Sequence, residues 1–239
     1  LRPLMSDLAS VRKDLVIANR ILANEGIIDA YGHVSVRHPD HPDRYIMAWS
    51  RSPELVEDED LLEFQLDGTP VQPTDKTLYI ERHIHGAVYE ARPEVMAACH
   101  NHDLAILPFS ISKDTKLQPV IHSGSVLGGD VPVWNIADEF GDTNFLVSNM
   151  PQGRSLAKVL GQGTAALMRA HGSVVAGRDV LEMVNACISM DKNAKVQLEA
   201  IRLGAYITLS PGELQARMGM LDSPTRFRAW EYWKRRAGF

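Results

Sequence analysis

Two histidines separated by one residue follow an apolar run near the middle of the chain. His100 and His102 come directly after residues 95–99, which have the composition of a buried strand. Side chains on a strand alternate between its two faces, so both imidazoles are expected to point the same way. Paired imidazoles at a strand end form half of a divalent metal site, although structural histidines at such a position are equally common.

A third histidine and a carboxylate are candidates for the other half. His171 lies in a tight connection between two apolar runs, and Glu81 lies on the otherwise apolar face of an expected helix. A buried carboxylate is costly unless it is paired or binds a cation. An internal hydrogen bond between Glu81 and His85, one helical turn later, is the simpler alternative. Three imidazoles with one open position are typical of a catalytic rather than a structural site.

The elements that must position these residues are those of one α/β domain over residues 1–239. Apolar residues recur at helical spacing from Leu4 to Leu22, which predicts a first helix that Ser6 could start. A long helix capped by Asp179 is also expected. The helix that carries Glu81 is expected over residues 77–90. Short strands are expected at residues 33–37, 45–49, 61–66, 95–99, 118–121, 164–168 and 173–176.

Composition limits the function classes. The chain has 239 residues, 45% of them hydrophobic, and a formal net charge of -5, which argues against nucleic acid as a partner. No apolar run reaches the roughly 18 residues of a membrane helix, and no secretory leader pattern is present. Cys99 and Cys187 lie in apolar runs. We expect buried free thiols there and therefore a cytoplasmic location.

Several of these residues occur in an order that resembles the class II aldolase/adducin family. The matching segments are Glu81, residues 91–95 (Ala-Arg-Pro-Glu-Val), His100-Asn101-His102 and Ala170-His171-Gly172. The resemblance implies that the three histidines bind a divalent metal and that Glu81 is the acid–base residue. It also implies a central, mainly antiparallel sheet flanked by helices. The expected assembly is a homotetramer with active sites at subunit contacts.

Three departures from the sugar-phosphate aldolases of this family point to another substrate. His33 replaces the asparagine of Gly-Asn-x-Ser, residues 49–53 (Trp-Ser-Arg-Ser-Pro) replace Thr-Pro-Ser-Gly, and Tyr79-Ile80 replaces Ser-Ser. The small residues that cradle a phosphate are therefore absent. An imidazole, a guanidinium and a phenol suit a planar aromatic acid instead. The expected substrate-binding residues are His33, Ser50, Arg51 and Tyr79.

Each of these assignments has a simpler alternative. Arg51 could form an ion pair with the acidic run at residues 54–60, His33 could make a structural hydrogen bond, and Tyr79 could only pack. The departures resemble those of the family's decarboxylases of hydroxylated aromatic dicarboxylic acids. Residues 228–233 of the tail are similar as well.

The resemblance to this branch implies a metal-dependent decarboxylase of a pyridine or benzene dicarboxylate. The foremost substrate is 3-hydroxy-2-methylpyridine-4,5-dicarboxylate, a vitamin B6 breakdown product. Mn²⁺ is the expected metal, and Zn²⁺, Co²⁺ and Fe²⁺ are the alternatives. Glu81 is expected to carry a proton to the ring, with its pKa raised by apolar surroundings. Competing hypotheses are an aldolase or epimerase acting on a sugar phosphate and a non-catalytic adducin-like interaction protein.

Overall fold

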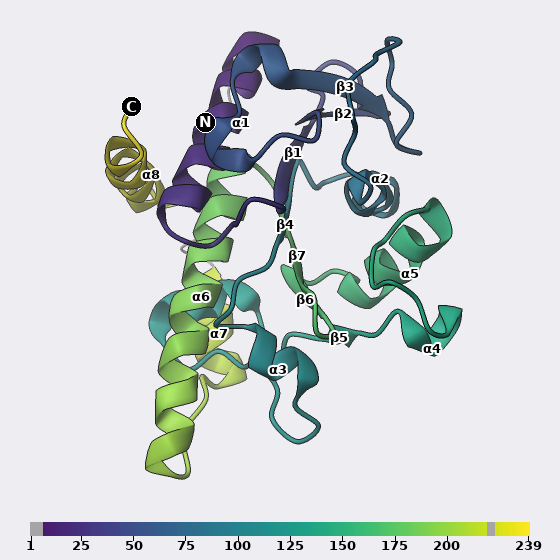
Figure 1. Cartoon of the computed structure of the whole chain (residues 1–239). Helices are drawn as coiled ribbons and strands as arrows, with labels where there is room; N and C mark the ends of the chain where they lie inside the picture. Colours follow the sequence, from purple (N-terminus) through teal and green to yellow (C-terminus); the bar gives the residue numbers. More distant parts are fainter. Residues whose placement is uncertain (1–6, 219–222) are drawn as a thin grey trace.

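Within the described residues, seven strands form one sheet in the order β3-β2-β1-β4-β7-β6-β5 (Figure 1). The computed structural model describes residues 7–218 and 223–239. All neighbouring strands are antiparallel except the parallel pair β5 and β6, which confirms the expected mainly antiparallel sheet. The strands are β1 His33–Arg37, β2 Arg44–Ala48, β3 Leu61–Gln65, β4 Ala97–Asn101, β5 Val133–Trp134, β6 Ala165–Met168 and β7 Gly172–Gly177. The strand expected at residues 118–121 is wrong, because backbone amides there donate to side chains of Gln197 and Asn193 and not to another strand.

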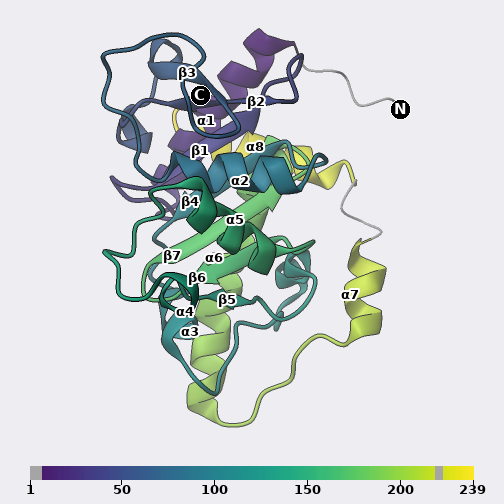
Figure 2. The same cartoon turned by 90° about the vertical axis from the view of Figure 1, so that its right-hand side faces the viewer.

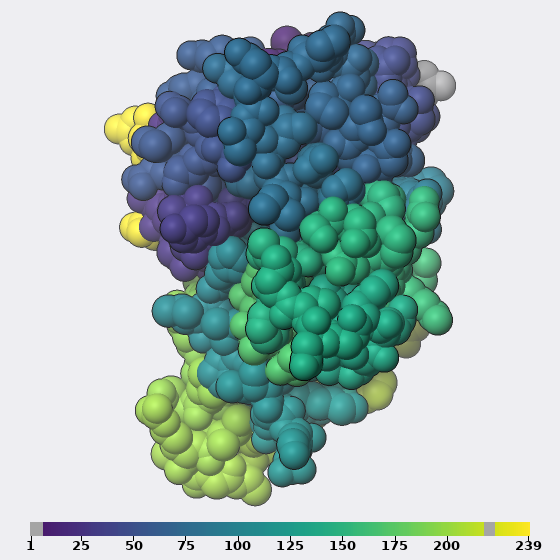
Figure 3. Space-filling view, turned by 45° about the vertical axis from the view of Figure 1, so that its right-hand side comes forward, coloured from purple at the N-terminus to yellow at the C-terminus, as the bar shows by residue number. Residues whose placement is uncertain are grey.

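Helices cover both faces of the sheet. Helices α1, α6 and α8 lie on one face and α2, α4 and α5 on the other, as Figures 1 and 2 show from two sides. In Figure 3 the green segment around α5 packs directly against the blue residues near α2. The helices are α1 Leu8–Asn24, α2 Arg82–Ala91, α3 Leu107–Ile111, α4 Ala137–Phe140, α5 Met150–Leu160, α6 Val180–Leu203, α7 Pro211–Met218 and α8 Thr225–Arg236; short 3₁₀ turns span Pro53–Leu55, Asp58–Asp60 and His122–Leu127.

The centre of the sheet is buried on both sides because it lies between these helical layers. Every residue of β1, β4 and β7 is buried, and Leu15, Ile21 and Leu22 of α1 are fully enclosed beneath the sheet. Each such side chain stabilises the fold by about 1.5–3 kcal/mol. A rigid centre of this kind holds the residues at its strand ends in fixed positions.

Strand register brings together three segments that carry candidate site residues. The Cα partner of His100 is His33 on β1 and Val174 on β7, while Asn101 is opposite Ser173. The C-terminal end of β4, the start of β1 and the β6–β7 turn therefore lie at the same end of these central strands. The candidate site histidines lie at this end.

Two helix starts differ from the sequence-based expectation. The side chain of Asp7 caps α1 by accepting from the Ser10 amide at 2.8 Å, and the expected starter Ser6 lies outside the described residues, as does Leu4. Helix α2 begins at Arg82 rather than at residue 77. The carbonyl of residue 77 accepts from the amide of Ser50, so the segment before α2 follows the loop after β2 instead of helical spacing.

The cysteine prediction is confirmed: Cys99 and Cys187 are buried and free. None of the helices in the described part of the chain combines the length and the apolar character that a membrane crossing requires.

Candidate metal centre

The backbone of β7 fixes the tautomer of His100. This side chain is fully buried, and its Nδ1 lies 3.0 Å from the carbonyl oxygen of Ser173. A carbonyl only accepts hydrogen bonds, so Nδ1 must carry the proton and donate it. The Nε2 atom of His100 then presents a lone pair, which is the form of imidazole that binds a metal.

A carboxylate fixes His102 in the same way. Its Nδ1 lies 3.1 and 3.2 Å from the two carboxylate oxygens of Asp29, so Nδ1 is the donor and Nε2 carries the lone pair. Its Nε2 is 3.0 Å from the Nε2 of His100. The two imidazoles thus meet on one side of the strand end, as alternation predicts.

A strained turn brings His171 to the same place. Ala170 has a φ of 56°, a left-handed conformation that is unfavourable for a residue with a Cβ. A Cβ on the following Gly172 would lie 2.0 Å from the carbonyl oxygen of Asn101, so only glycine permits this approach to β4. The ring of His171 is 5.0 Å from that of His100 and 5.2 Å from that of His102.

Glu81 completes the cluster from the N-cap position of α2. Its side chain is buried, with Oε1 accepting from the Val147 amide at 2.9 Å. Its Oε2 is 3.4 Å from Nε2 of His100 and 3.5 Å from Nε2 of His171. The alternative hydrogen bond to His85 is not formed, because His85 bonds to other partners.

The expected rise in the pKa of Glu81 is wrong. Burial does act to raise it, but His100 and His171 act more strongly in the other direction, and the pKa of Glu81 is lowered from its ordinary value. The error follows from placing Glu81 on an apolar helix face, whereas it lies before the helix and faces imidazoles. The carboxylate is therefore ionised in the resting site.

The donor atoms fit a divalent cation. Glu81, His100, His102 and His171 each offer one ligand atom, and these atoms all lie within 4.8 Å of one another. Two lone pairs facing each other at 3.0 Å repel unless a cation lies between them. Ligands of a tetrahedral zinc ion with bonds near 2.0–2.1 Å are themselves about 3.3 Å apart, which is close to these separations. Three nitrogens and one oxygen suit zinc, cobalt, iron or manganese.

Two of the expected substrate residues lie beside this cluster. His33 is buried, and its ring centroid is 5.1 Å from that of His100 and 4.6 Å from that of Tyr79. The Tyr79 hydroxyl donates to the carbonyl oxygen of Arg51. Burial raises the pKa of Tyr79, so its hydroxyl remains protonated and neutral. Its ring packs against the imidazole of His33.

Arg51 and Ser50 are less directly engaged. The Arg51 Nε atom lies 3.0 Å from Asp60 and 3.1 Å from the carbonyl oxygen of Leu55, so the ion pair with the acidic run is formed. The two terminal nitrogens of its guanidinium make no hydrogen bond to any described residue. Ser50 is exposed; its backbone amide donates to the carbonyl oxygen of residue 77, and its hydroxyl forms no hydrogen bond with a site residue in the described part of the chain.

The sequence analysis did not identify the residues that orient His102 and His33. Asp29 orients His102, while Ser35 and Tyr89 join His85 in a buried hydrogen-bond chain behind His33. Two spacings could have revealed this chain. Ser35 is two residues after His33 on a strand, and Tyr89 is four residues after His85 on a helix, so each pair shares a face.

The buried imidazoles make stability depend on pH. Burial lowers the pKa of His85 from 6.5 to about 3. Between these values the unfolded chain binds more protons than the folded one, so the free energy of unfolding rises with pH. This contribution is complete above about pH 6.5 and is lost as pH falls, at roughly 1.4 kcal/mol per pH unit for one group.

The pH dependence can be measured by chemical denaturation at pH 4 to 7. We expect His85→Phe to flatten the dependence in this range, whereas His41→Phe, at an exposed position, should leave its slope unchanged. Equal slopes in the His85 variant and the parent chain would contradict this account.

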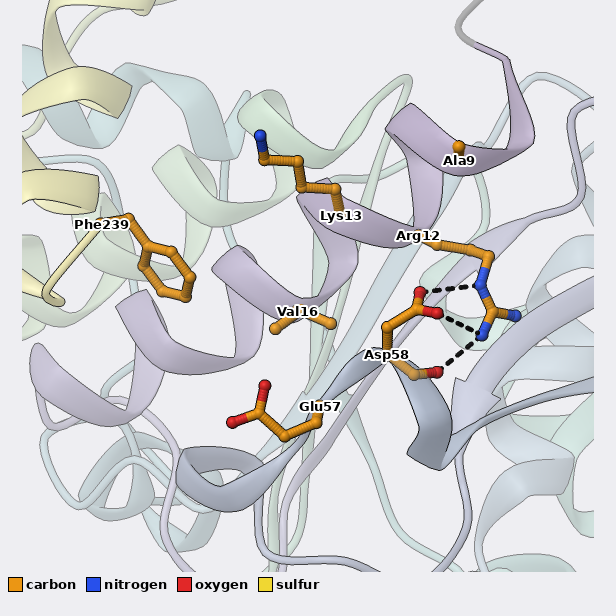
Figure 4. A pocket seen from close by; sticks show the side chains of 7 residues that line it. All are labelled: Ala9, Arg12, Lys13, Val16, Glu57, Asp58 and Phe239. Atoms are coloured by element: carbon orange, nitrogen blue, oxygen red, sulfur yellow. Dashed lines mark hydrogen bonds and ion pairs between the residues drawn. The ribbon is translucent and has the colours of Figure 1, made fainter.

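Surface pockets differ in their relation to the cluster. A pocket of about 300 Å³ is lined by Asp29, His102 and Asp103, so it reaches the outer side of the cluster. A larger one of about 390 Å³ lies along α1, where the guanidinium of Arg12 is already paired with Asp58 at 2.8 Å (Figure 4). The larger pocket shares no residue with the cluster. It is lined by Ala9, Arg12, Lys13, Val16, Glu57, Asp58 and Phe239.

The chain belongs to the class II aldolase and adducin family. Residues 13–198 match the family model described as the class II aldolase and adducin N-terminal domain. The fold agrees: an L-fuculose 1-phosphate aldolase from Glaciozyma antarctica superposes with a TM-score of 0.79 at 23% identity, covering 99% of this chain and 93% of its own.

Several curated relatives are named as decarboxylases. Decarboxylase tropJ of Talaromyces stipitatus is 30% identical over 238 residues, which cover 90% of this chain and 89% of that protein. A 3,4-dihydroxyphthalate decarboxylase of Arthrobacter keyseri is 23% identical over 239 residues, covering 92% of each. The chain is thus a class II aldolase-like protein, and some of its relatives are named as decarboxylases.

Proposed function

We propose that this protein is a metal-dependent decarboxylase of hydroxylated aromatic dicarboxylates. The observation that carries the proposal is the cluster of Glu81, His100, His102 and His171 beside a buried imidazole and phenol. In the sugar-phosphate branch this neighbourhood would contain small hydroxyl side chains. The relatives named as decarboxylases support the same reaction type.

The proposed substrates share one pattern on three consecutive ring carbons. In 3,4-dihydroxyphthalate, the first carries a hydroxyl and the next two carry carboxylates. The same pattern occurs in 3-hydroxy-2-methylpyridine-4,5-dicarboxylate. The carboxylate next to the hydroxyl is the one expected to leave, because only that ring carbon can be protonated to give a ketone at the neighbouring position. The relative from Arthrobacter keyseri supports a benzene ring, and the choice between the two rings is left to experiment.

The metal, held by the three histidines and adjacent to Glu81, would act as a Lewis acid on the ring oxygen and so lower the cost of its developing charge. The tautomers of His100 and His102 are already set for binding it, by Ser173 and Asp29. Mn²⁺ is our proposal among the divalent ions that this donor set accepts. A homotetramer with sites at subunit contacts remains part of the proposal.

Glu81 is the proposed proton carrier. Because its resting form is ionised, it must first take a proton, and the ring hydroxyl of the bound substrate is the source we assign. Glu81 then delivers this proton to the ring carbon that bears the departing carboxylate. The bond to that carboxylate breaks, its electron pair restores the aromatic ring, and carbon dioxide leaves. The product oxygen regains a proton from solvent.

His33 and Arg51 are proposed to hold the carboxylate that stays. The Nε2 atom of His33 has no partner among the described residues, and the terminal nitrogens of Arg51 also lack one. A planar guanidinium can bind a carboxylate through two parallel hydrogen bonds. Tyr79 would stack on the ring while fixing Arg51 through its backbone. Ser50 is kept as a weaker candidate because of its exposure.

A product assay over a small panel tests the reaction class. The panel contains 3,4-dihydroxyphthalate, 3-hydroxy-2-methylpyridine-4,5-dicarboxylate and L-fuculose 1-phosphate. We expect carbon dioxide and a monocarboxylate from at least one dicarboxylate, with no aldehyde from the sugar phosphate. Aldehyde release from L-fuculose 1-phosphate without carbon dioxide from either acid would replace the proposal with the aldolase hypothesis.

A further inference from the structure

A chain of hydrogen bonds lies behind His33, on the side away from its unpartnered Nε2. Tyr89 Oη is 2.7 Å from Ser35 Oγ, which is 2.6 Å from Nδ1 of His85, and Nε2 of His85 is 2.7 Å from Nδ1 of His33. At most 2% of each of these four residues is exposed. The four side chains come from β1 and α2, so the chain connects the sheet to the helix that follows Glu81.

We propose that Tyr89, Ser35 and His85 fix His33 in the tautomer that is protonated on Nε2, which then donates to a carboxylate of the substrate. The role given to the carboxylate rests on the proposed function. The tautomer itself does not, since it follows from the direction in which the buried chain must donate. Tyr89, Ser35 and His85 are thereby positioning residues.

The direction is set at the Tyr89 end. Burial raises the pKa of Tyr89, so its hydroxyl keeps its hydrogen, and Ser35 Oγ is its partner among the described side chains. Once Ser35 accepts from Tyr89, it must donate its own hydrogen to Nδ1 of His85. His85 is then protonated on Nε2 and donates to Nδ1 of His33. The remaining hydrogen of His33 lies on Nε2.

The opposite direction leaves a buried donor without an acceptor. If His33 donated to His85, then His85 would donate to Ser35, whose oxygen could also accept from Tyr89. Either the Ser35 or the Tyr89 hydroxyl hydrogen would then have no side-chain acceptor among the described residues. Burying an unpaired donor disfavours that arrangement by about tenfold or more. Tyr89 cannot easily turn away, because Arg37 lies 4.9 Å above its ring and donates to its carbonyl oxygen at 2.7 Å.

As a consequence, Nε2 of His33 presents a hydrogen-bond donor to the substrate rather than a lone pair. The His33 ring packs against both Tyr79 and the proposed ligand His100, with centroids 4.6 and 5.1 Å away. A hydrogen on Nε2 attracts an anionic oxygen, whereas the other tautomer would present a lone pair to it and repel it. Because Nδ1 of His33 accepts from His85, the ring holds a single hydrogen and is a neutral donor.

Nitrogen-15 NMR of histidine-labelled, zinc-loaded protein tests the tautomer directly. The ring signals of His33 are assigned by their absence in His33→Gln. We expect the pattern of a neutral ring protonated on Nε2. A ring protonated on Nδ1, or on both nitrogens, would overturn the proposal. This readout needs no turnover, so it remains decisive even if none of the proposed substrates is decarboxylated.

Two variants distinguish the effect of the hydrogen-bond chain on His33 from a general effect on packing. Ser35→Ala breaks it, so a measurable fraction of His33 should shift to the Nδ1 form and kcat/KM for 3,4-dihydroxyphthalate should fall about tenfold, mainly through KM. Tyr89→Phe removes the donor that sets the direction, so part of His33 should also shift to the Nδ1 form and kcat/KM should fall in the same sense, to a smaller extent because Ser35 still has His85 as its acceptor. If Ser35→Ala keeps its melting temperature and retains the Nε2 form completely, the chain does not set the tautomer.

Discussion

Replacing Glu81 with glutamine is expected to lower turnover by at least about two orders of magnitude while the metal stays bound. The amide cannot take up the proton that the ionised carboxylate accepts and returns. Glutamine keeps a carbonyl oxygen for the Val147 amide, so the start of α2 should hold its position. Initial rates and metal content per chain are measured on the same sample, which separates loss of chemistry from loss of metal.

Glu90→Gln is the matched control for this experiment. Glu90 lies on the same helix, is exposed and pairs with Arg154 at 2.7 Å, so its substitution should leave turnover within about twofold. Near-normal turnover by the Glu81 variant would remove Glu81 from the proposed role. A loss of metal in parallel with the rate would instead make Glu81 chiefly a ligand.

The second large effect is expected from His100→Ala, which should abolish both metal binding and turnover. His100 is central in the proposed ligand set: its Nε2 lies 3.0 Å from Nε2 of His102 and 3.4 Å from Oε2 of Glu81. Losing a ligand should weaken metal binding by more than the roughly 10–100-fold that losing an outer hydrogen-bond partner costs. Elemental analysis after dialysis should find well under one metal ion per ten chains.

The control for His100 is the exposed His41, whose replacement by alanine should leave metal content unchanged. A melting curve without added metal checks that the His100 variant folds, because an alanine in β4 leaves a cavity next to Ser173. Full metal occupancy in a folded His100→Ala protein would show that the assignment of ligands is wrong.

Local patterns were sufficient to bring the proposed metal ligands to one place and to predict most of the sheet. His100 and His102 follow an apolar run whose alternation alone determines that they share a side, and the structure places their Nε2 atoms 3.0 Å apart. His171 was recognisable because a short apolar connection ending in glycine must form a tight turn. Gly172 permits that turn to approach β4 closely.

What sequence could not provide is the tertiary contact that overrides a local pattern. Residues 77–80 have helical spacing, yet this segment contacts the loop after β2 and α2 begins only at Arg82. That shift moves Glu81 from an apolar face to a site among imidazoles and reverses the expected direction of its pKa. Asp29 and His102 are 73 residues apart, and no periodic pattern connects such a pair.

Two roles were proposed for Arg51 from the sequence, and the structure shows one of them. Its ion pair with Asp60 was one of two readings of the sequence, and it is formed. The proposed contact with a substrate carboxylate uses other atoms of the same guanidinium. Both roles are therefore compatible with the geometry, and binding of a dicarboxylate by Arg51 stays a prediction.

Carbon dioxide release is the most direct test of the central claim. The protein is stripped of metal with a chelator, reloaded with Mn²⁺, and supplied with 3,4-dihydroxyphthalate. We predict no release by the stripped protein, and one carbon dioxide per molecule of 3,4-dihydroxybenzoate formed by the reloaded protein. Equal rates of carbon dioxide release with and without metal, or no release from either dicarboxylate of the panel by a protein shown to hold metal, would contradict it.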